Sequence, residues 1–505
     1  MNPSRPTISE NPPEDAPRND SRPDRQPRQL LVLFLTEMWE RYGFYTMRGI
    51  LVLYMTKVFL FSDTAAYAMF AAFAALLFLT PLFGGWVADR FLGFRRSVLV
   101  GGVLLAVGYG LLGIPGRGML FRLALGTIIV GNGFFKPNVS GVVGQLYGKN
   151  DPRRDGGFTI FYAGINIGSV IPPLVTGWII IRFGWHPAFL VAASGVLVGT
   201  AIFFFGLRKR PELGAPPDTV RTRAERLGNY LLIGVGTPAA VYLFAELLRD
   251  TALTNVLLFV VGGLFLAYSF SRSFSYRDRR RERLIAVHIL ILFSIVFWAL
   301  YQQGAMSLTI FTEFNVGREV GGWTIPTVMF QSVNPFFVIL LVPFISRLWL
   351  RLERRGWNPS IPAKFALGTI FMGLGFVILP LAVAGAGAAG KTSLWWVVAS
   401  YFLQTLGELF ISPVGLSMIT GLSPKKLVGM MMGVWFFATA LANALAGFVS
   451  DWTALPSGTN NPLLTDRPFS HVFGIIGWIA VGVGVVFLFF APILKGLIEG
   501  AKREK

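Results

Sequence analysis

One stretch decides the class of protein: Leu35-Thr-Glu-Met-Trp-Glu-Arg-Tyr-Gly-Phe-Tyr-Thr-Met-Arg48. It lies inside an apolar run that extends from Leu30 to Leu60. Because about 20 apolar residues cross a bilayer as a helix, this run predicts a membrane span. It is too long for the apolar core of a signal peptide, and it contains charges. Ionisable groups inside a span are costly, so each is by default a candidate for function.

The charges of this stretch share one side of the predicted helix. At roughly 100° per residue and with Glu37 as zero, Arg41 falls at roughly 40° and Arg48 at roughly 20°. Tyr45 falls at roughly 80° and Glu40 at roughly −60°. A structural ion pair would explain one acid and one base, but Arg48 lies two turns from the nearest acid on its own helix. We therefore expect this face to line a pathway through the membrane.

The rest of the chain has the composition of a membrane protein. Of its 505 residues, 53% are hydrophobic and only 14% are charged, and the mean hydropathy is +0.59. Soluble domains carry about 25% charged residues. Fourteen stretches are long and apolar enough to span, with boundaries good to a few residues. They lie near 29–59, 65–88, 97–115, 119–147, 157–181, 186–206, 228–248, 254–272, 285–310, 323–349, 362–384, 393–418, 428–450 and 470–494.

Lysine and arginine support this count of spans. The two tails and alternate connections hold 34 of the 45 basic residues, and the opposite connections hold 8. The three that remain are Arg41, Arg48 and Lys136, which lie inside predicted spans. Such an asymmetry is the positive-inside pattern, and it places both termini in the cytoplasm. The net charge of +19 therefore reflects topology, and we expect no nucleic-acid partner.

The order of the spans predicts an all-α polytopic protein of two six-helix bundles. We assign 1–28 to a disordered cytoplasmic tail, 29–206 to the first bundle, 284–494 to the second and 495–505 to a second tail. Residues 207–283 form a linker that contains an inserted two-helix hairpin, which could also serve only as packing at the periphery. The chain has no cysteine, and its three histidines lack metal-ligand spacing, so we expect no metal and no cofactor. The sequence contains no nucleophile elbow and no phosphate-binding loop, so we do not expect an enzyme.

Two further ionisable residues lie inside spans. Lys136 stands in Gly131-Asn-Gly-Phe-Phe-Lys-Pro-Asn138, where a buried lysine needs an anion. Glu408 stands in Leu406-Gly-Glu-Leu-Phe-Ile-Ser-Pro413, with Ser412 one turn further on the same face. A basic cluster in the first half that faces an acid in the second half suits a zwitterion at the midplane. An inert, protonated Glu408 is the alternative.

A loop motif follows the second span: Gly84-Gly-Trp-Val-Ala-Asp-Arg-Phe-Leu-Gly-Phe-Arg-Arg96. Its Asp89 and arginines, among them Arg90, can cap helix ends and form ion pairs across a small loop. We interpret the motif as a gating element.

These motifs together resemble a known family. The Asp89-Arg90 loop is similar to the loop signature of the major facilitator superfamily, and Glu37-Met-Trp-Glu-Arg-Tyr-Gly-Phe-Tyr45 resembles the E-x-x-E-R-F-x-Y-Y signature of proton-dependent oligopeptide transporters. Further segments resemble that family, in its bacterial form, from about residue 31 to 450. They are Gly131 to Asn138, Phe161 to Ser169, Phe297-Trp298, Gln331 to Pro335, Gly407 to Pro413 and Met432 to Trp435.

The resemblance implies a symporter of the bacterial inner membrane that imports di- and tripeptides with protons by alternating access. Its partners would be these peptides, protons and the lipid bilayer, and we expect a monomer. By the matched positions, Arg48 and Lys136 would hold the peptide carboxylate and Glu408 its amino group. Polar contacts and pocket walls would come from Tyr45, Tyr162, Asn166, Asn334, Trp298 and Trp435, with Ser412 beside them. Proton coupling would involve Glu37, Glu40, Arg41, Lys136 and Glu408.

Three positions depart from the family pattern. Phe44 and Phe78 stand where many members have tyrosine, which makes the pocket more apolar. Gln302, one turn after Trp298, stands where many relatives have glutamate, and glutamine cannot titrate. Two other hypotheses stay open: a transporter of another anion or amino-acid-like substrate, and a transporter-like sensor without turnover.

Overall fold

The computed structural model describes residues 25–148, 151, 153–216, 223–277, 279–387, 389–424, 427–455, 459 and 461–499. Within these residues the chain forms fourteen long helices and one short one. Residues 1–24 and 500–505, which contain most of the two predicted tails, lie outside the described residues.

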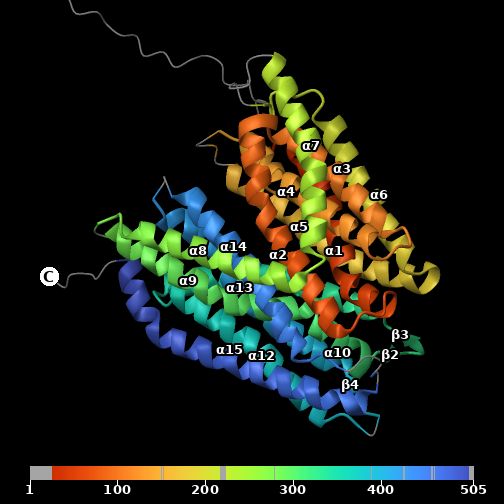
Figure 1. Ribbon diagram of the computed structural model, residues 1–505. Helices are drawn as coiled ribbons and strands as arrows, with labels where there is room; N and C mark the ends of the chain where they lie inside the picture. The colour runs from red at the N-terminus through yellow and green to blue at the C-terminus, as the bar shows by residue number, and fades with distance from the viewer. Residues whose placement is uncertain are drawn as a thin grey trace, which may run out of the picture.

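The first six helices form one bundle (Figure 1). In it α1 packs on α5 and α6, α3 packs on α4 and α6, and α2 packs on α4. The bounds are α1 Arg28–Lys57, α2 Asp63–Val87, α3 Phe94–Leu112, α4 Met119–Gln145, α5 Arg154–Phe183 and α6 Trp185–Gly206. A π-helical turn, η1 (Ala88–Leu92), joins α2 to α3.

The second bundle contains the helices from α9 to the C-terminal end. Here α12 packs on α13 and α15, and α14 packs on α9. The bounds are α9 Arg279–Tyr301, α10 Ser307–Asn315, α11 Val333–Arg354, α12 Ile361–Ala384, α13 Leu394–Leu422, α14 Val428–Asp451 and α15 Pro462–Glu499. Short 3₁₀ turns, η2 (Gln302–Ala305) and η3 (Thr327–Ser332), precede α10 and α11.

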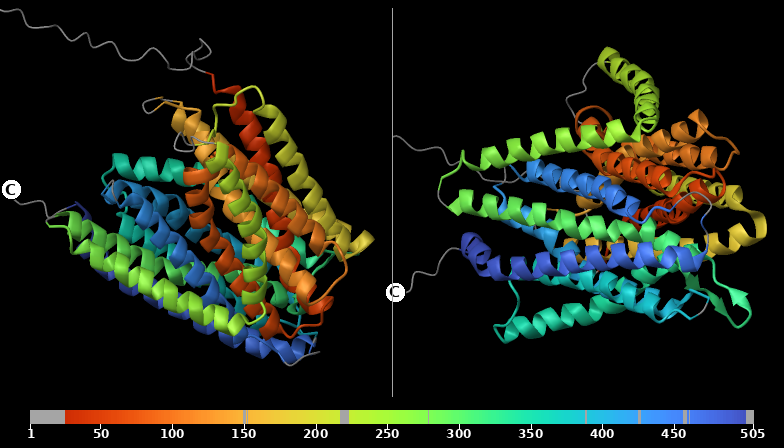
Figure 2. Two further views of the ribbon diagram at one scale, coloured as in Figure 1. Left: turned by 45° about the horizontal axis from the view of Figure 1, so that its top comes forward. Right: turned by 60° about the horizontal axis from the view of Figure 1, so that its bottom comes forward.

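The inserted hairpin bridges the two bundles. Its first helix, α7 (Arg223–Leu247), packs on α4, and its second, α8 (Thr251–Ser273), packs on α14, α9 and α2. Figure 2 shows α7 against the first bundle and α8 along the second. The expected architecture of two six-helix bundles with an inserted hairpin is confirmed.

Twelve stretches of the described chain are long and apolar enough to cross a membrane. The two long helices outside this set are α1, which carries the charges noted above, and α7, whose apolar part is only Ile233–Leu247. Burial of the α1 charges inside the bundle explains why a helix of modest hydropathy can still occupy a central position. The span predicted at 228–248 thus corresponds to α7, whose apolar part is shorter than predicted and which packs against α4.

Two predicted spans differ from the observed helices. The span predicted at 285–310 is interrupted at η2 and continues to Asn315. The span predicted from residue 323 begins too early, because Trp323–Thr324 is strand β3, paired antiparallel with β2 (Glu319–Val320). Gly321 and Gly322, both with positive φ, form the turn between these strands, as two-residue hairpins require. A second strand pair, β1 (Val316–Gly317) with β4 (Thr392–Ser393), is parallel and ties the end of α10 to the start of α13.

The bundles meet at the end of the molecule opposite the chain termini, here called the outer end. Figure 1 shows them close together near α10 and β2 to β4 and diverging toward the other end. At the outer end α5 packs on η3, and the Ser332 hydroxyl donates to the Val170 carbonyl at 2.6 Å. The helices pack closely through small residues. A Cβ on Gly84 of α2 would overlap the Gly133 carbonyl group of α4.

Candidate functional site

The charged face of α1 begins with a buried ion cluster of Glu37, Glu40 and Arg41. The Arg41 guanidinium donates to both Glu40 carboxylate oxygens, at 2.5 Å and 2.7 Å. Its Nε also lies 3.4 Å from Glu37 Oε1. Each of the three residues is at most 3% exposed, so the charges depend on one another and on hydrogen bonds. Two carboxyl groups thus share one guanidinium.

The second carboxyl oxygen of Glu37 differs from the first, which faces Arg41. Glu37 Oε2 is buried and has no hydrogen-bond partner among the described residues. Gly168 of α5 closes the cluster from one side, because a Cβ there would overlap the Met38 carbonyl oxygen. A buried, unpartnered carboxyl oxygen is costly in its charged form. The cluster therefore leaves one buried carboxyl oxygen without a hydrogen-bond partner among the described residues.

Arg48 lies two turns further along α1 and has a neutral partner. Its Nη2 donates to Gln302 Oε1 at 3.0 Å, and its Cζ lies 5.9 Å from the centre of the Tyr301 ring. The described residues show no ion pair for Arg48 within 4 Å. The guanidinium thus joins the two bundles through a neutral amide, without a carboxylate partner among the described residues.

A cavity of about 610 Å³, including space open to solvent, lies between the bundles beside Arg48. Six residues expected to bind substrate line it: Tyr45, Arg48, Tyr162, Asn166, Asn334 and Glu408. They come from α1, α5, α11 and α13, so both bundles contribute to one site.

Glu408 is held by an amide. Asn334 Nδ2 donates to Glu408 Oε2 at 2.9 Å and lies 3.0 Å from the Thr405 hydroxyl. The Tyr301 hydroxyl donates to Asn334 Oδ1 at 3.3 Å. Among the described residues Glu408 forms no ion pair within 4 Å, so the cavity has an acidic pole on α13 and a basic pole on α1.

Four other residues expected to bind substrate do not line this cavity in the conformation observed. Lys136 Nζ lies 5.3 Å from the centre of the Phe78 ring, a cation–π distance. Trp298 is partly buried, and its Nε1 has no partner among the described residues. Trp435 is 6% exposed and lies against Gly415, and Ser412 is half-buried on α13.

Several cavity residues were missed in the sequence: Tyr301, Gly304, Gln331, Tyr401 and Gln404. The break after α9 brings them together, because η2 frees the Gly304 carbonyl from the helix. The Gln331 amide donates to this oxygen, and so does the Tyr401 hydroxyl at 3.3 Å. The available sequence signal for these cavity residues was their polarity within apolar spans. Many polar residues in spans, however, serve only in packing between helices.

The loop motif after α2 forms η1, where Asp89 and Arg90 are both exposed. No ion pair within 4 Å involves either residue in the described part of the chain. The loop is held instead by its backbone, since Arg95 N–H donates to the Gly214 carbonyl at 3.0 Å. The gating role of Asp89 and Arg90 stays a prediction.

An ion pair connects the bundles at the outer end. Lys57, the last residue of α1, pairs with Glu313 of α10. Glu313 also lies 3.3 Å from Arg318 Nη2 and accepts a hydrogen bond from the Thr327 hydroxyl. Together with the contact of α5 on η3, these interactions close the outer end beyond the cavity. We name Lys57, Glu313, Arg318 and Thr327 the outer clasp.

The described residues contain no group of three or more His, Cys, Asp or Glu that could hold a metal ion. The arrangement offers a different chemistry: a polar cavity with one guanidinium group at Arg48, one carboxyl group at Glu408 and neutral hydrogen-bonding groups between them. A buried acid–base cluster lies one to two turns away on α1.

Comparisons with known proteins find similar chains and a similar fold. The model of the POT family matches residues 95–466. Dipeptide and tripeptide permease B of Salmonella typhimurium is 35% identical over 95% of this chain and 98% of its own length. A crystal structure of a mutant peptide transporter POT with alafosfalin superimposes with a TM-score of 0.82, at 34% identity over 95% of this chain and 98% of that one. A POT family transporter with 5-aminolevulinic acid gives 0.81, at 29% identity over 93% and 97% of the two chains.

Proposed function

This chain belongs to the POT family, and from that premise we propose that it imports di- and tripeptides together with protons. Transport would proceed by alternating access across a bacterial inner membrane, with both termini in the cytoplasm. The relatives are permeases and transporters rather than enzymes, which supports transport over catalysis.

The observation that carries the proposal is the pair of opposite charges in the cavity. Arg48 from α1 and Glu408 from α13 line it, and each has a neutral side-chain partner, Gln302 and Asn334 respectively. A peptide carboxylate would bind Arg48, and the peptide ammonium would bind Glu408. Both interactions are charge-assisted hydrogen bonds, which are stronger than neutral ones. Since the two poles belong to different bundles, a bound zwitterion would draw the bundles together.

Proton coupling is proposed for the buried cluster on α1. Glu37 has one unpartnered, buried oxygen and only a 3.4 Å contact to the Arg41 guanidinium. A proton on Glu37 would leave Arg41 paired with Glu40 alone. It would also remove a negative charge from the surroundings of Lys136, and this amine would attract an anionic group once it turns from Phe78 toward the cavity. Binding of the proton and of the peptide carboxylate would then favour each other.

Uptake into liposomes that contain the purified chain tests the proposal. We expect a labelled dipeptide to accumulate against its gradient only when an inward proton gradient is present. Glu37→Gln should still exchange peptide across the membrane at equal concentrations but should lose the gradient-driven accumulation. Lys136→Ala should lose accumulation as well. If Glu37→Gln, expressed at the same level, accumulates peptide as the unmodified protein does, the coupling proposal is wrong.

A second candidate is an amino-acid-like substrate. The complex of a similar POT family transporter with 5-aminolevulinic acid favours it, since that compound is named there as the bound ligand. A substrate held through its carboxylate alone would need the basic pole at Arg48 but not Glu408. Transport that survives in Glu408→Gln and is inhibited by 5-aminolevulinic acid but not by dipeptides would favour this candidate.

A further inference from the structure

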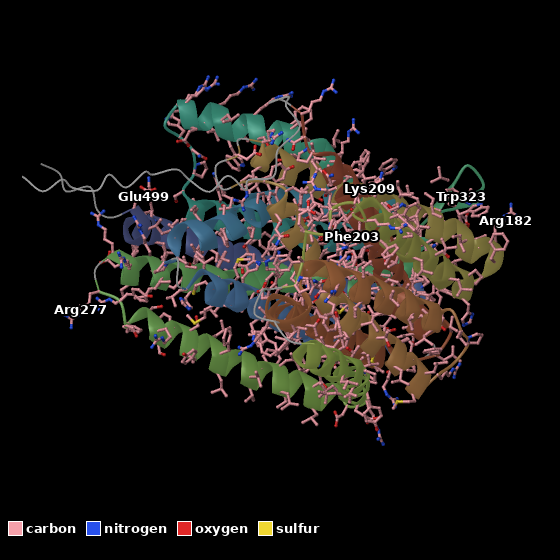
Figure 3. The ribbon with its side chains drawn as sticks, turned by 90° about the horizontal axis from the view of Figure 1, so that it is seen from above. Arg182, Phe203, Lys209, Arg277, Trp323 and Glu499 are labelled. Carbon is pink, nitrogen blue, oxygen red and sulfur yellow. The ribbon has the colours of Figure 1, made fainter. Side chains whose placement is uncertain are left out.

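A dense group of arginines joins the hairpin to the second bundle. We call residues 272–283 the arginine link, since they contain six arginines and only two acids, Asp278 and Glu282. Five of these arginines are exposed: Arg272, Arg277, Arg279, Arg280 and Arg281. No ion pair within 4 Å involves them in the described part of the chain. Figure 3 shows Arg277 pointing away from the protein at the far end of the helices. The structure thus leaves this positive charge available to a partner.

An apolar surface leads to the arginine link along α8. Leu257, Val261, Leu264 and Tyr268 recur at helical spacing and are 41%, 50%, 68% and 58% exposed. Phe274, at the end of α8, is 56% exposed. In a membrane protein such a stripe faces acyl chains. The positive charges therefore lie where the hydrocarbon region ends and the headgroups begin.

The link is held in place by contacts to both neighbours. Arg283 Nε donates to the Ile498 carbonyl at 3.0 Å, so the link lies at the C-terminal end of α15. On the membrane side, Ser269 Oγ of α8 lies 2.7 Å from His288 Nε2 of α9. His288 Nδ1 lies 2.8 Å from the Leu284 carbonyl and donates to it, so Nε2 accepts a hydrogen bond from the Ser269 hydroxyl. The described arginines thus lie between two helices, α8 and α9, that contact each other through Ser269 and His288.

We propose that the arginine link binds the headgroups of anionic phospholipids in the cytoplasmic leaflet and thereby anchors the α7–α8 hairpin. The proposal rests on the topology that places both termini in the cytoplasm and does not depend on the substrate. Clusters of four to eight basic residues directly beside a membrane span attract anionic lipids. The acyl chains lie along the exposed stripe of α8. Because α8 contacts α2 of the first bundle and α9 and α14 of the second, bound lipid holds the hairpin against both bundles.

A lipid-binding measurement on the whole protein tests the proposal. Phosphatidylglycerol or phosphatidylcholine is added to the purified chain, and bound lipids are counted by native mass spectrometry. The test variant carries four substitutions: Arg277→Gln, Arg279→Gln, Arg280→Gln and Arg281→Gln. Since each arginine near the surface contributes roughly a fivefold factor, we expect at least about a tenfold loss in phosphatidylglycerol binding. Phosphatidylcholine binding should not change.

Two further variants separate a site from general charge or misfolding. Replacing the same four arginines by lysine keeps the charge, and we expect phosphatidylglycerol binding within about threefold of the unmodified chain. The matched control removes four exposed arginines at the end of α11: Arg347→Gln, Arg351→Gln, Arg354→Gln and Arg355→Gln. This control should retain the phosphatidylglycerol binding of the unmodified chain.

Three results would overturn the proposal. The first is unchanged phosphatidylglycerol binding in the glutamine variant. The second is an equal loss in the α11 control, which would indicate total charge rather than the arginine link. The third is displacement of the lipid by a tenfold excess of soluble glycerol 3-phosphate, which would indicate a site for free phosphate esters.

Discussion

The outer clasp gives a sharp prediction about the balance between the two ends of the transporter. Lys57–Glu313 joins α1 of the first bundle to α10 of the second, whereas Arg318–Glu313 lies within the second bundle alone. Only the first pair has to break when the outer end opens. We therefore expect Lys57→Gln to favour the state that is open at the outer end, and Arg318→Gln to leave this balance nearly unchanged.

The size of the expected shift in the ratio of the two states follows from how exposed the Lys57–Glu313 ion pair is to water. The Lys57 side chain is 38% exposed and that of Glu313 is 13% exposed, so water screens the pair substantially. Double-mutant cycles on such partly exposed pairs give about 0.2–1 kcal/mol. At the upper limit this corresponds to about a fivefold change in the ratio of the two states. High salt should reproduce the shift in the unmodified chain, because it screens exposed charges.

Spin labels can report this ratio, because the chain contains no cysteine of its own. Ile114→Cys and Trp323→Cys place labels on exposed outer positions of the first and second bundles. Distance distributions between them should gain a longer component in Lys57→Gln and at high salt. If Arg318→Gln shifts the distribution as strongly as Lys57→Gln, or if salt has no effect, the assignment of the clasp as a gate is refuted.

Two other predictions concern the cavity and the packing. Gln302→Glu would place a carboxyl group about 3 Å from the Arg48 guanidinium, at the distance now held by the amide. Since an opposite charge at this range interacts strongly, we expect the KM for peptide to rise at least about tenfold at high pH and to return toward normal at low pH; a KM independent of pH would contradict this. Gly84→Ala would drive a Cβ into the Gly133 carbonyl group, so overpacking should lower stability by about 1–3 kcal/mol. Gly110→Ala, with open space around it, should leave the Tm unchanged.

The sequence by itself predicted the order of the long helices in the described chain, but not the break that separates α10 from α9. Water is absent from the bilayer core, so spanning segments must be long and apolar, and basic residues must lie mainly on one side. For the same reason the few charges inside spans were conspicuous. The cluster on α1 and the opposite poles at Arg48 and Glu408 could be predicted from residue types and helical spacing alone. Their roles in coupling and binding stay predictions.

Only the tertiary structure decided which polar side chains converge. The break at η2 exposes the Gly304 carbonyl and brings Tyr401 and Gln331 to the cavity. It also places Gln302 against Arg48, from a segment about 250 residues away in the chain. Hydropathy gave no sign of this break, since residues on both sides are apolar.

The rotation and tilt of each helix were likewise beyond the sequence. They depend on close contacts between small residues of distant helices, such as Gly84 with Gly133, and no periodicity records these contacts. The same packing turns Lys136 toward Phe78 rather than into the cavity and turns Asn334 toward Glu408. The charged face of α1 could thus be predicted from residue types and helical spacing, while the partners of each charge were decided by how the helices pack.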